Sequence, residues 1–169
     1  MPDHPAAQIE AHIPGLRRFA RQLLRGDPER ADDLVQDTLE RAWAKLHLYR
    51  RGTDLRAWLF TVMHNVHVNK VRATRVTDTL EDELPELAQR ASQGDALLVR
   101  DLDRAIARLP TEQRAVLLLV TLEEMSYEEV ARALDIPIGT VMSRLSRARE
   151  KLRMMMLGQG AAAKLKVVR

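Results

Sequence analysis

Hydroxyl and basic side chains recur on one face of a helix that the sequence predicts after Pro137. Short hydroxyls near the start of such a helix reach base edges or phosphates, and arginine guanidinium groups pair bidentately with guanine or phosphate. The residues of this face are Thr140, Ser143, Arg144, Arg147 and Lys151. The pattern favours a recognition helix that reads duplex DNA over a solvated basic face on an ordinary packing helix.

Two helices joined by a tight turn must position that face. Ser126 and Glu129 form a capping-box start for the first helix, because each side chain can satisfy a free backbone N–H of the first turn. Pro137, with its fixed φ and missing N–H, suits the first turn of the second helix. The buried stripe of that helix repeats at the 3.6-residue period and consists of Val141, Leu145, Ala148 and Leu152. Residues 126–152 are therefore predicted to form a helix-turn-helix.

The composition limits the class of protein. The chain has 169 residues, 46% of them hydrophobic but only 4% aromatic, so we expect an aliphatic, helical core in one domain or two small ones. The lack of cysteine excludes disulfides, zinc ribbons and cysteine nucleophiles. The N-terminus lacks the features of a signal peptide, and no apolar run approaches the ~18 residues of a membrane span, so we expect a cytoplasmic protein.

Catalysis and metal binding are not expected. No glycine-rich phosphate loop, no nucleophile with a partnering base and no isolated carboxylate pair occurs in the sequence. His64 and His67 lie three residues apart, but no carboxylate at a fitting spacing completes a metal site, so we expect both to be polar surface groups. We expect no enzyme, no cofactor and no metal.

The charge is distributed unevenly around a net value of +3. Residues 76–95 hold six acids and one base, whereas residues 137–157 hold five bases and one acid. The acidic stretch has few large apolar residues and contains Pro85 and Gly94, which predicts a linker. Its ~20 residues span about 65 Å when fully extended, roughly two turns of duplex DNA, so two domains joined by it can reach separated DNA sites.

Apolar residues at helical spacing predict the other helices. They lie near residues 16–24, 29–46, 54–75 and 97–109, with a further helix starting at Pro110. On the first, four arginines alternate with the apolar face: Arg17, Arg18, Arg21 and Arg25. We expect Trp43 and Trp58 in the core and Phe60 at the surface. Without strand-like alternation, the expected fold is all-α, with two small helical bundles joined by a flexible acidic linker and a helix-turn-helix in the second.

Three widely spaced stretches together resemble one protein family. They are DLVQDTLERAW at residues 33–43, WLFTVMHN at residues 58–65, and the segment from Leu109-Pro110 through the helix-turn-helix to Arg149. In this order they resemble an extracytoplasmic-function (ECF) sigma factor of the sigma-70 family over about residues 11–157. The resemblance implies that residues 1–75 form sigma region 2, 76–95 a linker, 96–157 sigma region 4 and 158–169 a basic tail.

The resemblance also implies partners and site residues. Such a protein directs core RNA polymerase to promoters and aids strand opening, through the β′ clamp helices, the β flap and promoter DNA, and it is held by an anti-sigma factor. Core polymerase would be bound by Asp33, Gln36, Asp37, Glu40 and Arg41. The −10 element would be bound by Tyr49, Arg50, Arg51, Gly52, Asn65, Asn69, Lys70 and Arg72. The −35 element would be bound by Thr140, Ser143, Arg144, Ser146, Arg147 and Lys151.

Two departures from the family pattern and two alternatives stand beside this interpretation. Met142 and Ser146 replace an arginine and a bulky residue that many relatives carry, which changes the expected −35 preference. Tyr49 and Phe60 are the only aromatic candidates for base stacking, so base capture in the loop would replace an extended stacking platform. The alternatives are a sigma-like mimic that sequesters an anti-sigma factor, and a dimeric helix-turn-helix repressor.

Overall fold

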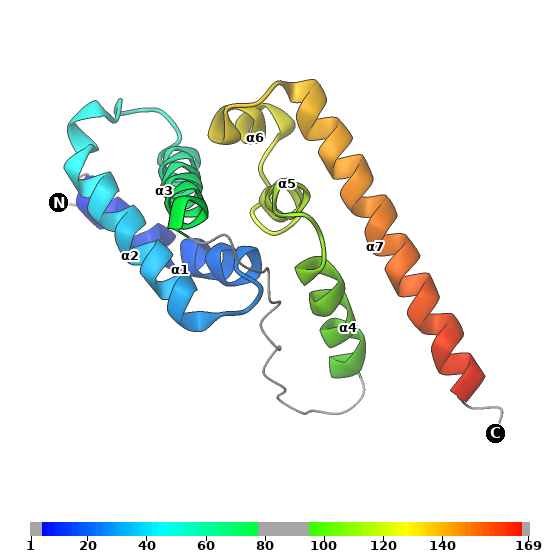
Figure 1. Ribbon diagram of the computed structural model, residues 1–169. Helices are drawn as coiled ribbons and strands as arrows, with labels where there is room; N and C mark the ends of the chain where they lie inside the picture. The colour runs from blue at the N-terminus through cyan, green and yellow to red at the C-terminus, as the bar shows by residue number, and fades with distance from the viewer. Residues whose placement is uncertain (1–4, 78–94, 167–169) are drawn as a thin grey trace.

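The computed structural model describes residues 5–77 and 95–166, and within these ranges it is helical throughout, with no strand (Figure 1). The elements are α1 (Pro5–Leu23), α2 (Pro28–Ala44), the short 3-10 turn η1 (Leu46–Leu48), α3 (Leu55–Thr77), α4 (Asp95–Ala107), α5 (Thr111–Thr121), α6 (Tyr127–Leu134) and α7 (Ile138–Lys166). The all-α prediction is confirmed. The predicted acidic linker lies, apart from its ends, outside the described residues.

Helices α1, α2 and α3 form the N-terminal bundle around interlocking aliphatic and aromatic side chains. Phe19 and Phe60 meet edge to face with ring centroids 5.2 Å apart, and Phe60 is only 3% exposed. The expectation of a surface Phe60 is therefore wrong. Trp43 is 49% exposed instead of buried, because Val35, Thr38 and Ala42 form the inner face of α2 and the next residue is turned about 100° away from it.

Local capping defines the helix starts in this bundle. Asp27 accepts a hydrogen bond from the Arg30 N–H at 3.1 Å, and Pro28 follows in the first turn of α2, as the sequence predicts. At the start of α3, the Ala57 N–H donates to Asp54 at 3.2 Å, while the Thr53 hydroxyl donates to the Arg50 carbonyl. Asp54 is thus the cap of α3.

The C-terminal bundle consists of α4 to α7, and α6 with α7 forms the predicted helix-turn-helix. The Ser126 hydroxyl accepts from the Glu129 N–H at 3.2 Å, and the Glu129 carboxylate accepts from the Ser126 N–H at 2.7 Å, which completes the capping box. Asp135 ends α6 in the left-handed region at φ 53°. Helix α7 continues through Lys166, well into the predicted basic tail at residues 158–169.

The two bundles pack directly against each other. Helix α1 contacts α5, and α3 contacts α6, so the N-terminal bundle lies beside the helix-turn-helix (Figure 1). Their buried apolar side chains form one continuous core cluster. The structure therefore describes a closed arrangement of the two bundles.

Candidate nucleic-acid interface

The predicted reading face lies on the first turns of α7. Val141, Leu145 and Ala148 are at most 2% exposed and hold the opposite side of the helix in the core. Since this buried stripe fixes the rotation of α7, the reading face must point outward. Among its members the exposed residues are Ser143, Ser146, Arg147 and Lys151, and the half-buried ones are Thr140 and Arg144.

Arg144 is already engaged within the protein. Its guanidinium lies 3.3 Å from the carboxylate of Glu112, at the start of α5. Burial and, second, the positive charge of Arg144 lower the pKa of His64 on α3, so the recognition helix and α3 lie within electrostatic range of each other. Arg144 must leave Glu112 before it can contact a base or phosphate.

The predicted −10 surface spans α3 and the loop before it. Asn65 and Asn69 are both exposed and lie one turn apart, about 6 Å along the helix axis. An amide side chain both donates and accepts, so this pair can read an unpaired base edge or hold a phosphate. Lys70 and Arg72 are exposed on the same helix, and Arg50 and Arg51 are exposed in the loop.

The loop is closed by its own contacts. The Tyr49 hydroxyl donates to the Thr53 carbonyl at 2.5 Å, and the Tyr49 ring lies against Trp58 with centroids 5.4 Å apart. Gly52 adopts φ +89°, a conformation that favours glycine, and a Cβ at this position would meet no atom within 4 Å. Tyr49 therefore braces the loop in this arrangement, while the loop arginines stay free to reach a strand.

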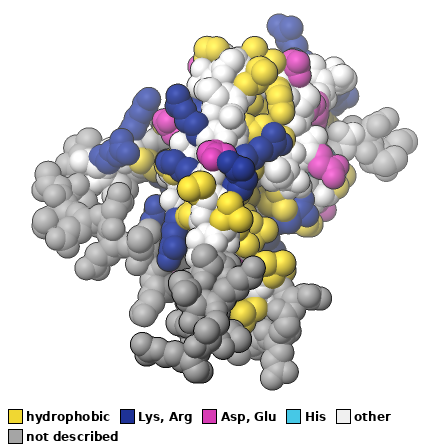
Figure 2. Space-filling model, turned by 90° about the vertical axis from the view of Figure 1, so that its right-hand side faces the viewer, with side chains coloured by type: hydrophobic (Ala, Val, Ile, Leu, Met, Phe, Trp, Pro, Cys, Tyr) yellow, Lys and Arg dark blue, Asp and Glu magenta, His cyan; other side chains and the backbone are white. Residues whose placement is uncertain are grey.

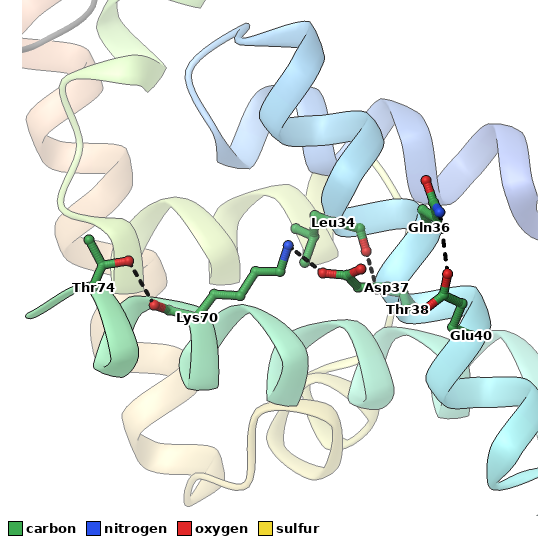
Figure 3. A network of polar contacts seen from close by, with 7 residues as sticks. All are labelled: Leu34, Gln36, Asp37, Thr38, Glu40, Lys70 and Thr74. Atoms are coloured by element: carbon green, nitrogen blue, oxygen red, sulfur yellow. Dashed lines mark hydrogen bonds and ion pairs between the residues drawn. The ribbon is translucent and has the colours of Figure 1, made fainter. Parts of the chain in front are cut away.

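The predicted polymerase face lies on the outer side of α2. Gln36 donates to Glu40 at 3.3 Å, and both are exposed with Asp33 and Arg41. Figure 3 shows that Asp37 points the other way, toward α3, where its carboxylate pairs with the Lys70 ammonium. One residue of the polymerase set is thus joined to one residue of the −10 set.

Trp43 extends this face of α2, although the sequence predicted it in the core. It lies seven residues after Gln36 and three after Glu40, which places the three on one side of the helix. The spacing alone contained that signal, but the residue type suggested a core position. A large half-exposed indole beside polar groups is the composition of a protein-binding hot spot.

A buried arginine joins the two bundles. Arg114 of α5 is 1% exposed and donates only to backbone carbonyls, which carry the partial negative charge of helix C-termini. The acceptors are Leu23 at the end of α1 (2.5 Å) and Ile106 (3.1 Å), Ala107 (3.1 Å) and Leu109 (2.6 Å) around the end of α4. Burial, and second the charge of Arg25, lower the pKa of Arg114 to about 10, so the side chain remains charged at neutral pH.

Two further groups lie between the bundles. Glu123, 3% exposed, accepts from Arg18 of α1 at 3.0 Å, and a Cβ on Gly15 would lie only 3.3 Å from its carboxylate. His67 is 9% exposed, and its Nε2 has no hydrogen-bond partner. The expectation that His67 is a surface group is therefore wrong, because α3 packs its side against α6.

The described parts of the chain contain neither a candidate metal site nor a candidate membrane-spanning helix. Residues 5–77 and 95–166 contain no cluster of three or more His, Cys, Asp or Glu side chains that could hold a metal ion. No helix in these ranges has the length and apolar character needed to cross a bilayer. The fold defines a two-bundle helical protein whose second bundle presents a helix-turn-helix with an exposed hydroxyl and basic stripe.

Comparison with known proteins identifies the family. Residues 9–64 match the family model "Sigma2 domain of PhyR", and residues 100–152 match "Sigma-70, region 4". The chain is 38% identical over 155 residues to the ECF RNA polymerase sigma factor EcfG of Rhodopseudomonas palustris, covering 90% of this chain and 85% of that protein. It is 33% identical to the ECF sigma factor SigM of Mycobacterium tuberculosis, covering 87% of this chain and 82% of the relative.

Solved structures agree with this assignment. The sigma factor RpoE of Bartonella quintana, in complex with the anti-sigma factor NepR, is 34% identical and superposes with a TM-score of 0.71 over 96% of both chains. CnrH, in complex with the cytosolic domain of CnrY, is 26% identical with a TM-score of 0.67, over 91% of this chain and 88% of CnrH. The chain belongs to the ECF RNA polymerase sigma factors. It directs core RNA polymerase to specific promoters for transcription initiation. The matches to ECF sigma factors favour this function over the mimic and repressor alternatives.

Proposed function

We propose that the sigma factor divides its work among three faces. The outer side of α2, with Asp33, Gln36, Glu40 and Arg41, binds the clamp helices of core polymerase, and Asp37 braces it from the α3 side. The Asn65 and Asn69 face of α3, with Lys70, Arg72 and loop residues 49–52, holds the unpaired −10 strand. The exposed stripe of α7 reads the −35 element, and its outward direction, imposed by the buried Val141 and Leu145, is the observation that carries this proposal.

In this proposal sigma region 2 spans residues 1–75 and sigma region 4 spans residues 96–157, with 76–95 between them. The two promoter elements are separated by about two turns of duplex, roughly 70 Å. In the closed arrangement, however, His64 of α3 lies within the electrostatic range of Arg144 on the recognition helix. Promoter binding therefore requires the bundles to separate, which breaks the contacts of Arg18 and Arg114 with the opposite bundle.

An anti-sigma factor has a suitable surface on the C-terminal bundle. Helices α4 and α7 pack together, and their exposed large apolar side chains include Leu97, Leu98, Leu102, Met154 and Leu157. Figure 2 views the molecule from the α7 side and shows hydrophobic side chains interspersed with Lys and Arg. The RpoE structure is a complex with an anti-sigma factor, NepR. An amphipathic partner helix with acidic flanks matches this surface.

The chain itself catalyses nothing in this proposal. It supplies binding free energy and strand capture, and core polymerase performs nucleotide transfer. Met142 and Ser146 stand in the recognition helix where many other sigma factors carry an arginine and a bulky residue. They therefore alter the −35 preference relative to those sigma factors.

The test is transcription by purified chain and core polymerase from a randomised promoter library. We expect a selected pair of −10 and −35 sequences, and Arg147→Ala should relax selection in the −35 part alone. A matched control, Arg108→Ala, removes an exposed positive charge from the loop after α4. Failure of every library promoter to support transcription would reject the proposal, as would an Arg147→Ala variant with unchanged −35 selection.

A further inference from the structure

The outward face of α1 carries a cluster of arginines that none of the three proposed faces uses. Arg17, Arg18 and Arg21 are all exposed, and Arg17 and Arg21 are one helical turn apart. They line a surface hollow of about 430 Å³ whose other residues are Ile13, Pro14 and Gln22. The hollow therefore has a cationic wall and few apolar side chains.

The charges of this cluster are poorly compensated within the protein. Arg104 pairs with Asp101, Arg153 with Glu150 and Arg144 with Glu112. Within residues 5–77 and 95–166, by contrast, no carboxylate lies within ion-pair distance of Arg17 or Arg21. Neighbouring guanidinium groups without a counter-charge repel each other, and a bound polyanion relieves that repulsion.

Arg18 differs because a carboxylate from the other bundle occupies it. Glu123, between α5 and α6, is 3% exposed and lies 3.0 Å from the Arg18 guanidinium, which is 53% exposed. Separation of the bundles removes Glu123 from α1. The cluster then gains its third free guanidinium, next to Arg17 and Arg21.

We propose that the arginine face of α1, formed by Arg17, Arg18 and Arg21, binds phosphates of promoter DNA, and that Glu123 takes the place of a phosphate at Arg18 in the closed arrangement. This inference rests on the proposed separation of the bundles on promoter DNA. Guanidinium groups bind phosphate bidentately, and such contacts position the protein without reading sequence. An acidic protein would be the other polyanion, but the lining of the hollow holds no Trp or Tyr, the aromatic anchors typical of protein interfaces, and its only apolar residues are Ile13 and Pro14.

The first test measures promoter binding by the assembled holoenzyme against salt concentration. Each phosphate contact contributes about 0.7 to 0.9 to the slope of log K against log salt, so R17A/R21A should lower the slope by roughly 1.4 to 1.8. The matched control R100A/R108A removes one positive charge from the middle of α4 and one from the loop after it, and should leave the slope unchanged. Core-polymerase affinity of each variant is measured separately.

Two results would overturn the inference. One is a slope equal to that of the wild type in R17A/R21A holoenzyme. The other is a loss of core-polymerase affinity in R17A/R21A at an unchanged promoter slope, which would assign the face to an acidic protein surface. Wild-type holoenzyme still selects promoters in either case, so failure here is distinct from failure of the proposed function.

The second test addresses Glu123 in the free chain. Glu123→Gln keeps the shape of the side chain but removes the charge that holds Arg18, so the free chain should bind promoter DNA several-fold more tightly. R18A/E123Q should lose that gain. Circular dichroism and urea unfolding establish that each variant is folded, and a folded E123Q chain with wild-type DNA affinity would contradict the role of Glu123.

Discussion

Asp37 of α2 and Lys70 of α3 form an ion pair, with the Oδ2 and Nζ atoms 2.5 Å apart (Figure 3). This contact joins a residue of the proposed polymerase face to a residue of the proposed −10 face. Both side chains are 43% exposed, so solvent screens the pair, and its structural contribution is small. The pair instead fixes the direction of each side chain relative to its own face.

A double-mutant cycle separates these roles. We expect D37A and K70A to show a coupling of about 0.2–1 kcal/mol in the free energy of urea unfolding. K70A should also weaken promoter opening by the holoenzyme, because it removes a cation from the −10 face. Equal opening by K70A and wild-type holoenzymes would exclude that role, and E29Q, at an exposed position in the first turn of α2, serves as the control.

Release of Arg144 from Glu112 should favour −35 binding. E112Q removes the competing carboxylate, which is 73% exposed, so a modest gain in −35 affinity is expected, with its largest size at low salt. R144A should cost about 1–3 kcal/mol and relax preference at one base pair if Arg144 reads a base. Binding titrations with single-substituted −35 sequences check both, and a uniform loss across all sequences would assign Arg144 to a phosphate.

Replacement of Arg114 should destabilise the closed arrangement strongly. Arg114→Met keeps much of the side-chain volume but removes the guanidinium donor from the carbonyls of Leu23, Ala107 and Leu109 in buried contacts, and we expect a loss of about 3 kcal/mol or more in the free energy of unfolding. Urea unfolding measures this loss, and R108A is the exposed control. A loss below 1 kcal/mol would show that water replaces the guanidinium.

His67 should make the closed fold sensitive to acid. Burial is the largest cause that lowers its pKa from 6.5 to about 4, followed by the positive charges of His64, Arg30, Arg114 and Lys70. Because the unfolded chain takes up the proton first, stability is full above pH 6.5 and declines as the pH falls toward 4. The loss between pH 7 and pH 5 should be about 2 kcal/mol.

Urea unfolding at the two pH values measures the acid effect. His67→Gln removes the titrating group and should flatten the pH dependence, whereas a variant of an exposed histidine, His47→Gln, should not. An unchanged pH profile in the His67 variant would assign the acid sensitivity to other groups.

Trp43 should contribute to polymerase binding without stabilising the fold. Its side chain is half exposed beside Gln36 and Glu40, so Trp43→Ala should weaken core-polymerase affinity by about 2 kcal/mol, the size expected of an interface hot spot. Leu157→Ala removes an exposed apolar side chain from α7 and is the control. Competition with the wild-type chain for core polymerase measures the affinity of each variant. Equal affinities of Trp43→Ala and wild type would show that Trp43 does not contribute to polymerase binding.

Local patterns predicted much of the C-terminal bundle correctly. The Ser126 and Glu129 capping box and the stripe of Val141, Leu145 and Ala148 both appear as expected. These features involve residues three or four positions apart, so helix geometry alone brings their side chains together. The same locality explains why the reading face of α7 could be named from its spacing.

The assignment of aromatic residues was decided by tertiary packing. Trp43 was expected to be buried and is exposed, whereas Phe60 was expected to be exposed and is buried. Hydrophobicity indicates a preference for burial, but it does not tell which residue of a helix packs against the neighbouring helix. Phe60 is buried because Phe19 of α1 lies against its ring. No pattern within α3 contains that information.

By itself, the sequence determined the helical class, the capping box of α6, the helix-turn-helix and the family, because each depends on short spacings or on ordered motifs. Only the tertiary structure decided how Arg114 meets the Leu23 carbonyl 91 residues away, and how Arg18 meets Glu123 across 105 residues. An unpaired buried charge is costly, so each buried charge needs a partner. Packing of the two bundles decides which groups come within hydrogen-bond distance of it. The closed arrangement of the two bundles follows from that packing. So does the ion pair that neutralises Arg18, one of the three arginines on the outward face of α1.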